Sequence, residues 1–177
     1  MNYISLGYFC SIALDLDKLG LRAASYPFDW LITDFEGVIN CMKNNFKDFL
    51  NVDFLYQNTK RPYVYKNIKY NFEFYHDFSR HKPLKNQLVT VNEKYKRRTQ
   101  RFYDSIKEET IFIRYISDEI KINGKSKELI YIEENYDSIV QFLKSFNKKN
   151  EIIFIGNEGL NSSIINVYNV KKDKGDK

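Results

Sequence analysis

Glycine, proline and cysteine are all scarce in this sequence. Seven glycines and three prolines among 177 residues argue against an all-β sandwich, because its many turns need both residue types. Two cysteines, Cys10 and Cys41, are too few for a disulfide framework, so we expect both thiols to be reduced. Reduced thiols indicate a cytoplasmic protein, which could equally be a viral protein in the cytoplasm of its host cell. The N-terminus has no basic start and no long apolar run follows, which predicts neither a secretion signal nor a membrane span.

The excess of positive charge is small. Twenty-eight Lys and Arg residues face 23 Asp and Glu residues, giving a formal charge of +5. Residues 171–177 hold four lysines and two aspartates, so +2 of this charge belongs to a segment that we predict to be a flexible, charged tail. The remaining +3 is less than domains that bind double-stranded nucleic acid normally carry, and no aromatic RNA-binding pattern accompanies the basic residues. We therefore expect no nucleic-acid partner.

Apolar and aromatic residues, by contrast, are plentiful. Apolar residues make up 43% of the chain and aromatic residues 16%, which is too much bulk for a disordered chain. A chain of this length can bury one core without cross-links. We predict a single domain over residues 1–170.

Strand and helix patterns alternate at both ends of the chain. Three segments have the pattern of apolar strands and two that of amphipathic helices: residues 2–6, 111–115 and 152–155, and residues 10–19 and 127–146. Apolar strands of this kind are typical of a parallel sheet that is covered on both faces. In the middle of the chain, Tyr70, Phe72 and Phe74 alternate with polar residues, which indicates antiparallel strands. The sequence therefore predicts an α/β fold of three layers, with a mostly parallel sheet and an antiparallel excursion.

Two helices in the middle of the chain have predicted starting points. Thr33 and Glu36 match a capping box, and the apolar stripe that follows predicts a helix as far as Phe49. Asn92 is predicted to cap a second helix, after a polar loop over residues 79–87.

A parallel sheet also predicts where a ligand binds. The carboxyl ends of its strands gather at one edge, and open α/β sheets bind ligands there. Three segments would meet at that edge: residues 7–10, 114–115 and 156–159. Gly7, Arg114 and Asn157 are therefore candidate binding residues.

Cys10 is the sharpest candidate for chemistry. It lies in the first turn of a predicted helix, where free N–H groups and the positive end of the helix dipole favour the nucleophilic thiolate. The alternative is that Cys10 is a small buried apolar residue, as cysteine often is. Cys41 lies between apolar stripe residues in mid-helix, and we expect it to be structural.

Only two histidines are present, which limits the choice of a general base. His76 ends a predicted strand on its inward-facing side, whereas His81 lies in a Lys-containing loop. A Cys–His pair needs a third group to orient the imidazole, and Asp29 is the better candidate because Asp77 points to the opposite face from His76. The alternative is that His76 has a structural role at the end of its strand, where its ring nitrogens find hydrogen-bond partners. Separated cysteines and histidines have no zinc spacing, and nucleotide-binding loops are absent, so no metal or cofactor is expected.

A strongly basic helix is the third feature. It carries five cations and no anion between Lys94 and Arg101. Arg98 shares the inward face with Tyr95 and Phe102, and Arg101 follows one turn later. An inward guanidinium needs a carboxylate or a phosphate as its partner. That partner is either one of the protein's own acids or an anionic group of a ligand, held by Arg98 alone or with Arg114.

Several short motifs between residues 3 and 115 belong together: Ser5-Leu6-Gly7 before Cys10, Leu21-Arg22, Ser25-Tyr26-Pro27-Phe28-Asp29-Trp30, His76-Asp77-Phe78, Lys94-Tyr95, Arg97-Arg98 and Arg101-Phe102. With these motifs the chain resembles one known family, described as papain-like cysteine peptidases and found in bacteria and large DNA viruses.

The resemblance implies Cys10 as the nucleophile and His76 as the base of a hydrolase or acyl-transferase. It also implies a papain-like α+β fold as the alternative architecture. Trp30 belongs to an aromatic loop that directly follows the Cys10 helix, so we expect it to form a wall of the substrate cleft.

Two further functions stay open. Members of the family often accompany glycan assembly, which implies a domain that binds a glycan or a nucleotide sugar, with arginines holding an anionic group. An inactive binding module is the third possibility. The substrate is accordingly expected to be a small molecule, a peptide or a glycan.

Overall fold

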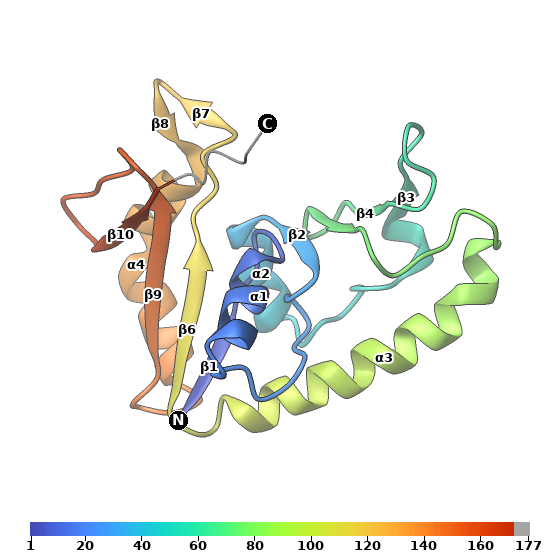
Figure 1. Cartoon of the computed structure of the whole chain (residues 1–177), viewed down its shortest axis with the longest axis horizontal. Helices are drawn as coiled ribbons and strands as arrows, with labels where there is room; N and C mark the ends of the chain where they lie inside the picture. Colours follow the sequence, from blue (N-terminus) through green and yellow to red (C-terminus); the bar gives the residue numbers. More distant parts are fainter. Residues whose placement is uncertain (172–177) are drawn as a thin grey trace.

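The structure is a computed structural model that describes residues 1–171. Apart from Lys171, the predicted tail lies outside the described residues. Four strands form a parallel sheet in the order β1-β6-β9-β10: β1 (Asn2–Ser5), β6 (Thr110–Tyr115), β9 (Glu151–Asn157) and β10 (Val167–Val170). The α/β prediction with a mostly parallel sheet is confirmed, and Figure 1 shows this sheet at one end of the molecule.

A second, antiparallel sheet is inserted between β1 and β6. Its order is β2-β5-β4-β3, and its strands are β2 (Leu31–Thr33), β5 (Phe72–Phe74), β4 (Tyr65–Asn67) and β3 (Leu55–Gln57). A 3-10 helix precedes β3 at Val52–Phe54, and a short hairpin precedes the last helix, formed by β7 (Lys121–Ile122) and β8 (Lys125–Ser126). The antiparallel excursion was predicted from the alternation around Phe72, which the observed burial of Phe72 and Phe74 reproduces.

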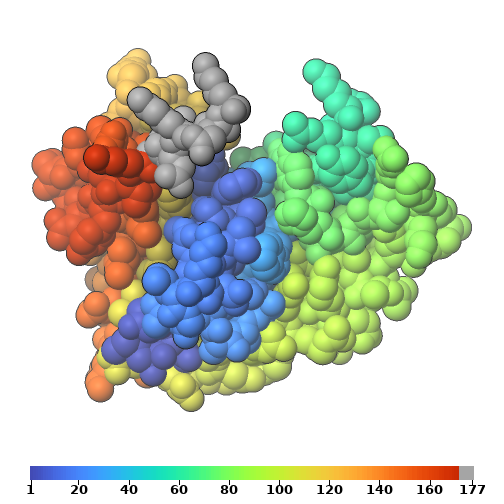
Figure 2. All heavy atoms as spheres, in the orientation of Figure 1, coloured from blue at the N-terminus to red at the C-terminus, as the bar shows by residue number. Residues whose placement is uncertain are grey.

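Helices pack on both faces of the parallel sheet. The four helices are α1 (Ser11–Lys18), α2 (Phe35–Lys43), α3 (Leu84–Ser105) and α4 (Lys127–Lys144). In Figure 1, α1 lies in front of the sheet and α4 behind it, while the long α3 runs along the base of the molecule. Figure 2 shows the N-terminal segment, in blue, between the C-terminal strands and the central part of the chain. Within the described residues, no helix has the length and apolar character that crossing a membrane requires.

Two predicted helix starts are wrong. Thr33 ends strand β2, and Asp34 caps α2 instead, with its carboxylate accepting a hydrogen bond from the Gly37 N–H at 3.0 Å. The helix stops at Lys43, so the apolar side chains that follow it pack from turns rather than from a helix. Helix α3 starts at Leu84 rather than after Asn92, because the apolar stripe of the helix extends back through Val91 to the core.

Aromatic packing joins the inserted segment to the rest. Phe28, from the aromatic loop before β2, is fully buried, and its ring lies 5.3 Å from that of Phe46 and 5.9 Å from those of Phe72 and Phe102. These residues come from a loop, a turn, sheet and helix, so one cluster fixes four segments together. The loop that contains Phe28 is therefore part of the core.

Arg114 is the most unusual buried residue. It is 0% exposed, and its Nε and Nη2 donate to the two carboxylate oxygens of Glu128 at 2.7 and 2.8 Å. Nη1 donates to the Leu6 carbonyl at 2.9 Å and to Thr33 Oγ1 at 2.7 Å, and Nη2 also donates to the Thr33 carbonyl at 2.8 Å. All five donors of the guanidinium are used inside the protein. The prediction that Arg114 binds a ligand is therefore wrong. Arg114 instead joins both sheets to α4 through its hydrogen bonds.

Replacement of Arg114 by alanine should lower the free energy of unfolding by about 3–5 kcal/mol, because it leaves the Glu128 carboxylate buried without its partner. Urea unfolding followed by circular dichroism measures this. Arg97→Ala, at an exposed position of α3, is the matched control and should change stability by less than about 0.5 kcal/mol. The double variant Arg114→Met/Glu128→Leu should recover much of the loss. A similar, small change for Arg97→Ala and Arg114→Ala would contradict the role of the pair.

Candidate active site

The chain turns sharply between β1 and α1. Gly7 and Tyr8 both have positive φ, 80° and 82°, and a Cβ on Gly7 would lie 2.4 Å from Thr33 Oγ1. The Tyr8 N–H donates to Thr33 Oγ1 at 2.8 Å, and the Thr33 N–H donates to the Tyr8 carbonyl at 3.2 Å. A tyrosine in the left-handed region is strained, and these two bonds hold it there. The turn delivers the chain to the N-terminus of α1.

Cys10 is the N-cap residue of α1, as expected from its position at a predicted helix start. Its side chain does not cap the helix, and it is partly exposed. The Cys10 carbonyl accepts the first helical bond, from the Leu14 N–H at 3.1 Å. The N–H groups of the first turn have no acceptor within the helix, so they remain beside a free thiol.

Cys41 has a different environment. It is fully buried in α2, and burial raises the pKa of its thiol well above the usual range. A buried neutral thiol is a poor nucleophile. Of the two cysteines, only Cys10 has a side chain that reagents can reach from solvent.

Strand β2 connects the segments of Cys10 and His76. On one edge, β2 pairs with β5, so that Leu31 lies opposite Phe74, two residues before His76. On its other edge, the backbone of Thr33 is bonded to that of Tyr8, two residues before Cys10. The fold thus places the two segments on either side of one three-residue strand, although they are 66 positions apart in sequence.

His76 is exposed and lies next to the aromatic loop. Its ring meets the ring of Trp30 edge-on, with the centroids 6.3 Å apart. The guanidinium of Arg22 lies over the Trp30 ring, 5.3 Å from its centroid. Such a contact restricts the tryptophan, and the tryptophan in turn limits the positions of the imidazole.

Asp29 is buried in the aromatic loop. It accepts hydrogen bonds from Arg22 at 2.9 and 3.3 Å and from the Tyr26 N–H at 2.9 Å. Burial raises the pKa of the Asp29 carboxyl, and the bonds from Tyr26 and Arg22 oppose that rise. No hydrogen bond joins Asp29 to His76 in the part of the chain that the structure describes, so its role as the third catalytic group stays a prediction.

The residues after His76 are fixed to helix α3. Asp77 accepts a hydrogen bond from the Tyr95 hydroxyl at 2.9 Å and forms an ion pair with Lys94. The Arg98 guanidinium lies 5.4 Å from the centroid of the Tyr95 ring, and its Nη1 is buried without a hydrogen-bond partner among the described residues. The predicted role of Arg98 in binding an anionic group stays a prediction.

Arg101 has a structural contact. It is exposed, and its Nη1 donates to the carbonyl of Ser25 at 2.9 Å, which ties α3 to the aromatic loop. A role for Arg101 in substrate binding also stays a prediction.

A cavity of about 850 Å³ opens at the carboxyl edge of the parallel sheet. Residues from all three segments predicted to meet there line it, among them Tyr8, Phe9, Tyr115 and Asn157. The Tyr8 and Tyr115 rings are stacked, 5.7 Å apart with 13° between their planes, and the Tyr115 hydroxyl donates to Asn157 Oδ1. Phe9 and Ser11, the residues on either side of Cys10, belong to this lining.

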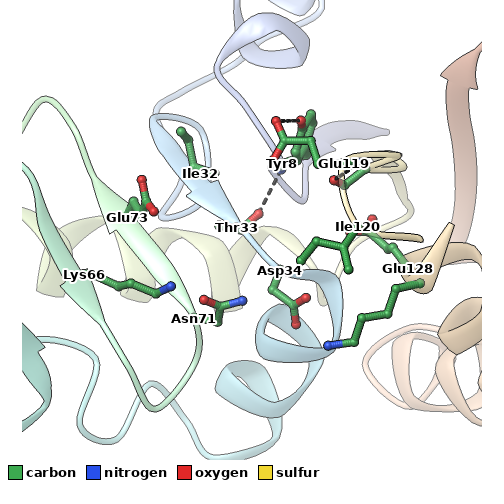
Figure 3. A pocket seen from close by; sticks show the side chains of 12 residues that line it. Tyr8, Ile32, Thr33, Asp34, Lys66, Asn71, Glu73, Glu119, Ile120 and Glu128 are labelled. Atoms are coloured by element: carbon green, nitrogen blue, oxygen red, sulfur yellow. Dashed lines mark hydrogen bonds between the residues drawn. The ribbon is translucent and has the colours of Figure 1, made fainter. Parts of the chain in front are cut away.

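A smaller cavity of about 180 Å³ lies between the antiparallel sheet and the segment that leads into α4, and Figure 3 shows the side chains around it. Tyr8 and Glu119 line both cavities, and the Tyr8 hydroxyl donates to Glu119 Oε1 at 2.8 Å. Burial raises the pKa of Tyr8 to about 12, so this hydroxyl stays a donor at neutral pH. No cluster of side chains suited to a metal ion occurs among residues 1–171.

Sequence reasoning missed Tyr8, Thr33 and Glu119 as residues of this region. Tyr8 follows Gly7 directly, so its place beside the sheet edge could have been inferred. Thr33 was assigned to a helix cap, and nothing in the sequence indicates that its side chain and backbone bind both Tyr8 and Arg114.

A sequence model of the family described as "Putative papain-like cysteine peptidase" matches residues 1–155. The chain belongs to this family. The matched part includes Cys10, His76 and most of β9. An uncharacterized protein of Acanthamoeba polyphaga mimivirus is 35% identical over 178 aligned positions, which cover 88% of this chain and 77% of the viral protein. No solved structure gives a significant match.

The variant Gly7→Ala should be destabilised by roughly 2–4 kcal/mol, because it combines a positive φ with a clash against Thr33. Gly20→Ala is the matched control: φ is +68° there, but a Cβ meets nothing within 4 Å. It should cost only about 1 kcal/mol, which is the price of the positive φ alone. If both variants lose the same free energy of unfolding in urea, the close contact with Thr33 is not what requires glycine at position 7.

Cys10 should react with iodoacetamide at neutral pH far faster than Cys41, because only Cys10 is accessible. Peptide mapping by mass spectrometry locates the label. Cys10→Ala should remove the fast reaction and Cys41→Ala should leave it unchanged. Labelling of both cysteines at the same rate in the folded protein would contradict this assignment.

Proposed function

We propose that this protein is a cysteine-dependent hydrolase or acyl-transferase in which Cys10 attacks the carbonyl carbon of an amide, ester or thioester. Membership of a family described as papain-like cysteine peptidases supports the reaction class. The observation that carries the proposal is the free, partly exposed thiol of Cys10 at the start of α1, in a segment whose residues Phe9 and Ser11 line a cavity at the carboxyl edge of the parallel sheet.

His76 is proposed as the general base. In the first step the Cys10 sulfur bonds to the carbonyl carbon while the thiol proton passes to the imidazole. The leaving group then departs with that proton, which leaves an acyl group on Cys10. Water, or a second acceptor nucleophile, releases the acyl group with the imidazole again as the base.

The first turn of α1 is proposed to stabilise the negative oxygen of the intermediate. Its N–H groups have no acceptor inside the helix, and they point toward the N-terminus, where Cys10 lies. The dipole of the helix adds to this stabilisation.

Arg22 and Asp29 are proposed as positioning residues. Asp29 fixes Arg22, Arg22 lies over Trp30, and Trp30 meets the His76 ring at its edge. This chain of contacts limits the orientations of an otherwise exposed imidazole.

Binding of an anionic glycan or nucleotide sugar is the weaker alternative. It used Arg98, Arg114 and the turn over residues 156–159 to hold the anion, and the donors of Arg114 are all used within the protein. Arg98 and that turn remain to support it.

The test uses a peptidyl acyloxymethyl ketone, an electrophile that needs an attacking thiolate. We expect a covalent adduct on Cys10, detected by intact mass and peptide mapping, and none on Cys10→Ala. His76→Ala should slow the second-order rate by roughly 10²–10⁴-fold, the usual contribution of a general base. His81→Ala is the matched control, since His81 is exposed in a loop, and it should leave the rate unchanged.

Melting curves show whether each variant is folded. An adduct on Cys41, or equal rates for His76→Ala and His81→Ala in folded proteins, would remove the proposed mechanism.

A further inference from the structure

The cavity beside Cys10 is large enough to select a substrate. Its volume of about 850 Å³ falls in the range of sites that enclose small molecules or a few amino-acid residues. Tyr8, Phe9, Ser11 and Ile12 come from the turn and helix that carry Cys10, so a group bound there would contact the residues that flank Cys10, although Cys10 itself does not line the cavity.

The walls of this cavity are aromatic and aliphatic. Tyr8 and Tyr115 form a stacked pair, Phe9 is half exposed, and Ile12 and Ile155 complete the apolar surface. Surfaces of this kind bind the aliphatic part of a long side chain. The faces of tyrosine rings also attract a cation.

Carboxylates surround these apolar walls. Among the described residues, the lining contains Asp15, Asp118 and Glu119 against one cation, Lys171, which gives these four a net formal charge of −2 in a protein whose total charge is +5. The N-terminus of α1 opposes this with about half a positive charge, which leaves the sum negative.

The charges of the three carboxylates are only weakly satisfied. The Asp15 carboxylate lies 3.6 Å from the ammonium group of Lys18, and the Asp118 carboxylate lies 3.2 Å from that of Lys121. Both lysines are well exposed to solvent. Exposed pairs of this kind contribute little, so the carboxylates stay available to another cation. Within residues 1–171, Glu119 accepts a hydrogen bond only from a neutral hydroxyl, that of Tyr8, at 2.8 Å.

We propose that this cavity is a specificity subsite for a basic side chain, lysine or arginine, of a peptide substrate. The aliphatic stem lies against Tyr8 and Tyr115, and the ammonium or guanidinium group reaches Asp118 and Glu119. This assignment rests on the proposed function and names its substrate class. An anionic ligand would meet three carboxylates, and a purely apolar ligand would leave them without a partner.

The experiment measures binding on Cys10→Ala, which cannot form an acyl-enzyme. Blocked pentapeptides with a central lysine, arginine, norleucine or glutamate are titrated by calorimetry at low and at physiological salt. Norleucine has the stem of lysine without its charge, so it isolates the role of the cation. Free 1,5-diaminopentane tests whether an amine without a peptide is sufficient.

Lysine and arginine peptides should bind about tenfold more tightly than the norleucine peptide, and the difference should shrink at higher salt. Asp118→Asn/Glu119→Gln should remove this preference; the glutamine keeps an acceptor for Tyr8. Glu134→Gln/Asp137→Asn, two exposed positions on α4, is the matched control and should keep it.

Equal affinity for lysine and norleucine peptides would overturn the subsite. So would a lysine preference that survives Asp118→Asn/Glu119→Gln, the absence of measurable peptide binding, or diaminopentane binding as tightly as the peptide. The proposed function is tested separately, because it depends on the adduct at Cys10 rather than on this preference.

Discussion

A buried ion pair holds the two sheets of this protein in register. Arg114 lies near the carboxyl end of β6 without contact to solvent, and Glu128 in the first turn of α4 neutralises it. The remaining donors of the guanidinium bind the chain just after β1 and the end of β2. Sliding one sheet against the other would leave a charge unpaired in the core, which is among the costliest defects a protein can have.

Thr33 connects the buried ion pair to the turn that precedes Cys10. Its hydroxyl accepts hydrogen bonds from Arg114 at 2.7 Å and from the Tyr8 N–H at 2.8 Å, and its own N–H binds the Tyr8 carbonyl. Gly7 is required beside it, since no other residue leaves room for the hydroxyl. The position of Cys10 at the start of α1 therefore follows from the same contacts that stabilise the core.

Charges of opposite sign occupy different sides of the site. Around the aromatic loop, Arg22, Arg98 and Lys94 outnumber Asp29 and Asp77, and both carboxylates are already bound by a cation. At the carboxyl edge of the parallel sheet the balance is reversed, with three carboxylates around aromatic walls. A protein with a net positive charge thus keeps an acidic cavity at the segment that carries Cys10, which is the basis for the proposed selection of basic side chains.

The sequence by itself determined the α/β class, the parallel sheet, the antiparallel excursion and the helix start at Cys10. Those features depend on local periodicity and on how apolar a strand is, which neighbouring residues report directly. It did not determine where α2 and α3 begin, because Asp34 competes with Thr33 as a cap, and Leu84 and Leu88 pack against the core before Asn92, which was predicted to cap α3.

Only the tertiary structure decided what Arg114 and Thr33 do. An inward arginine can pair with a ligand or with the protein's own acid, and that choice depends on which distant carboxylate the fold brings near. Here it was Glu128, and the two acceptors from Thr33 and Leu6 completed the set. The placement of the Cys10 and His76 segments on either side of β2 is of the same kind, since strand pairing between distant residues leaves no trace in the local pattern of either segment.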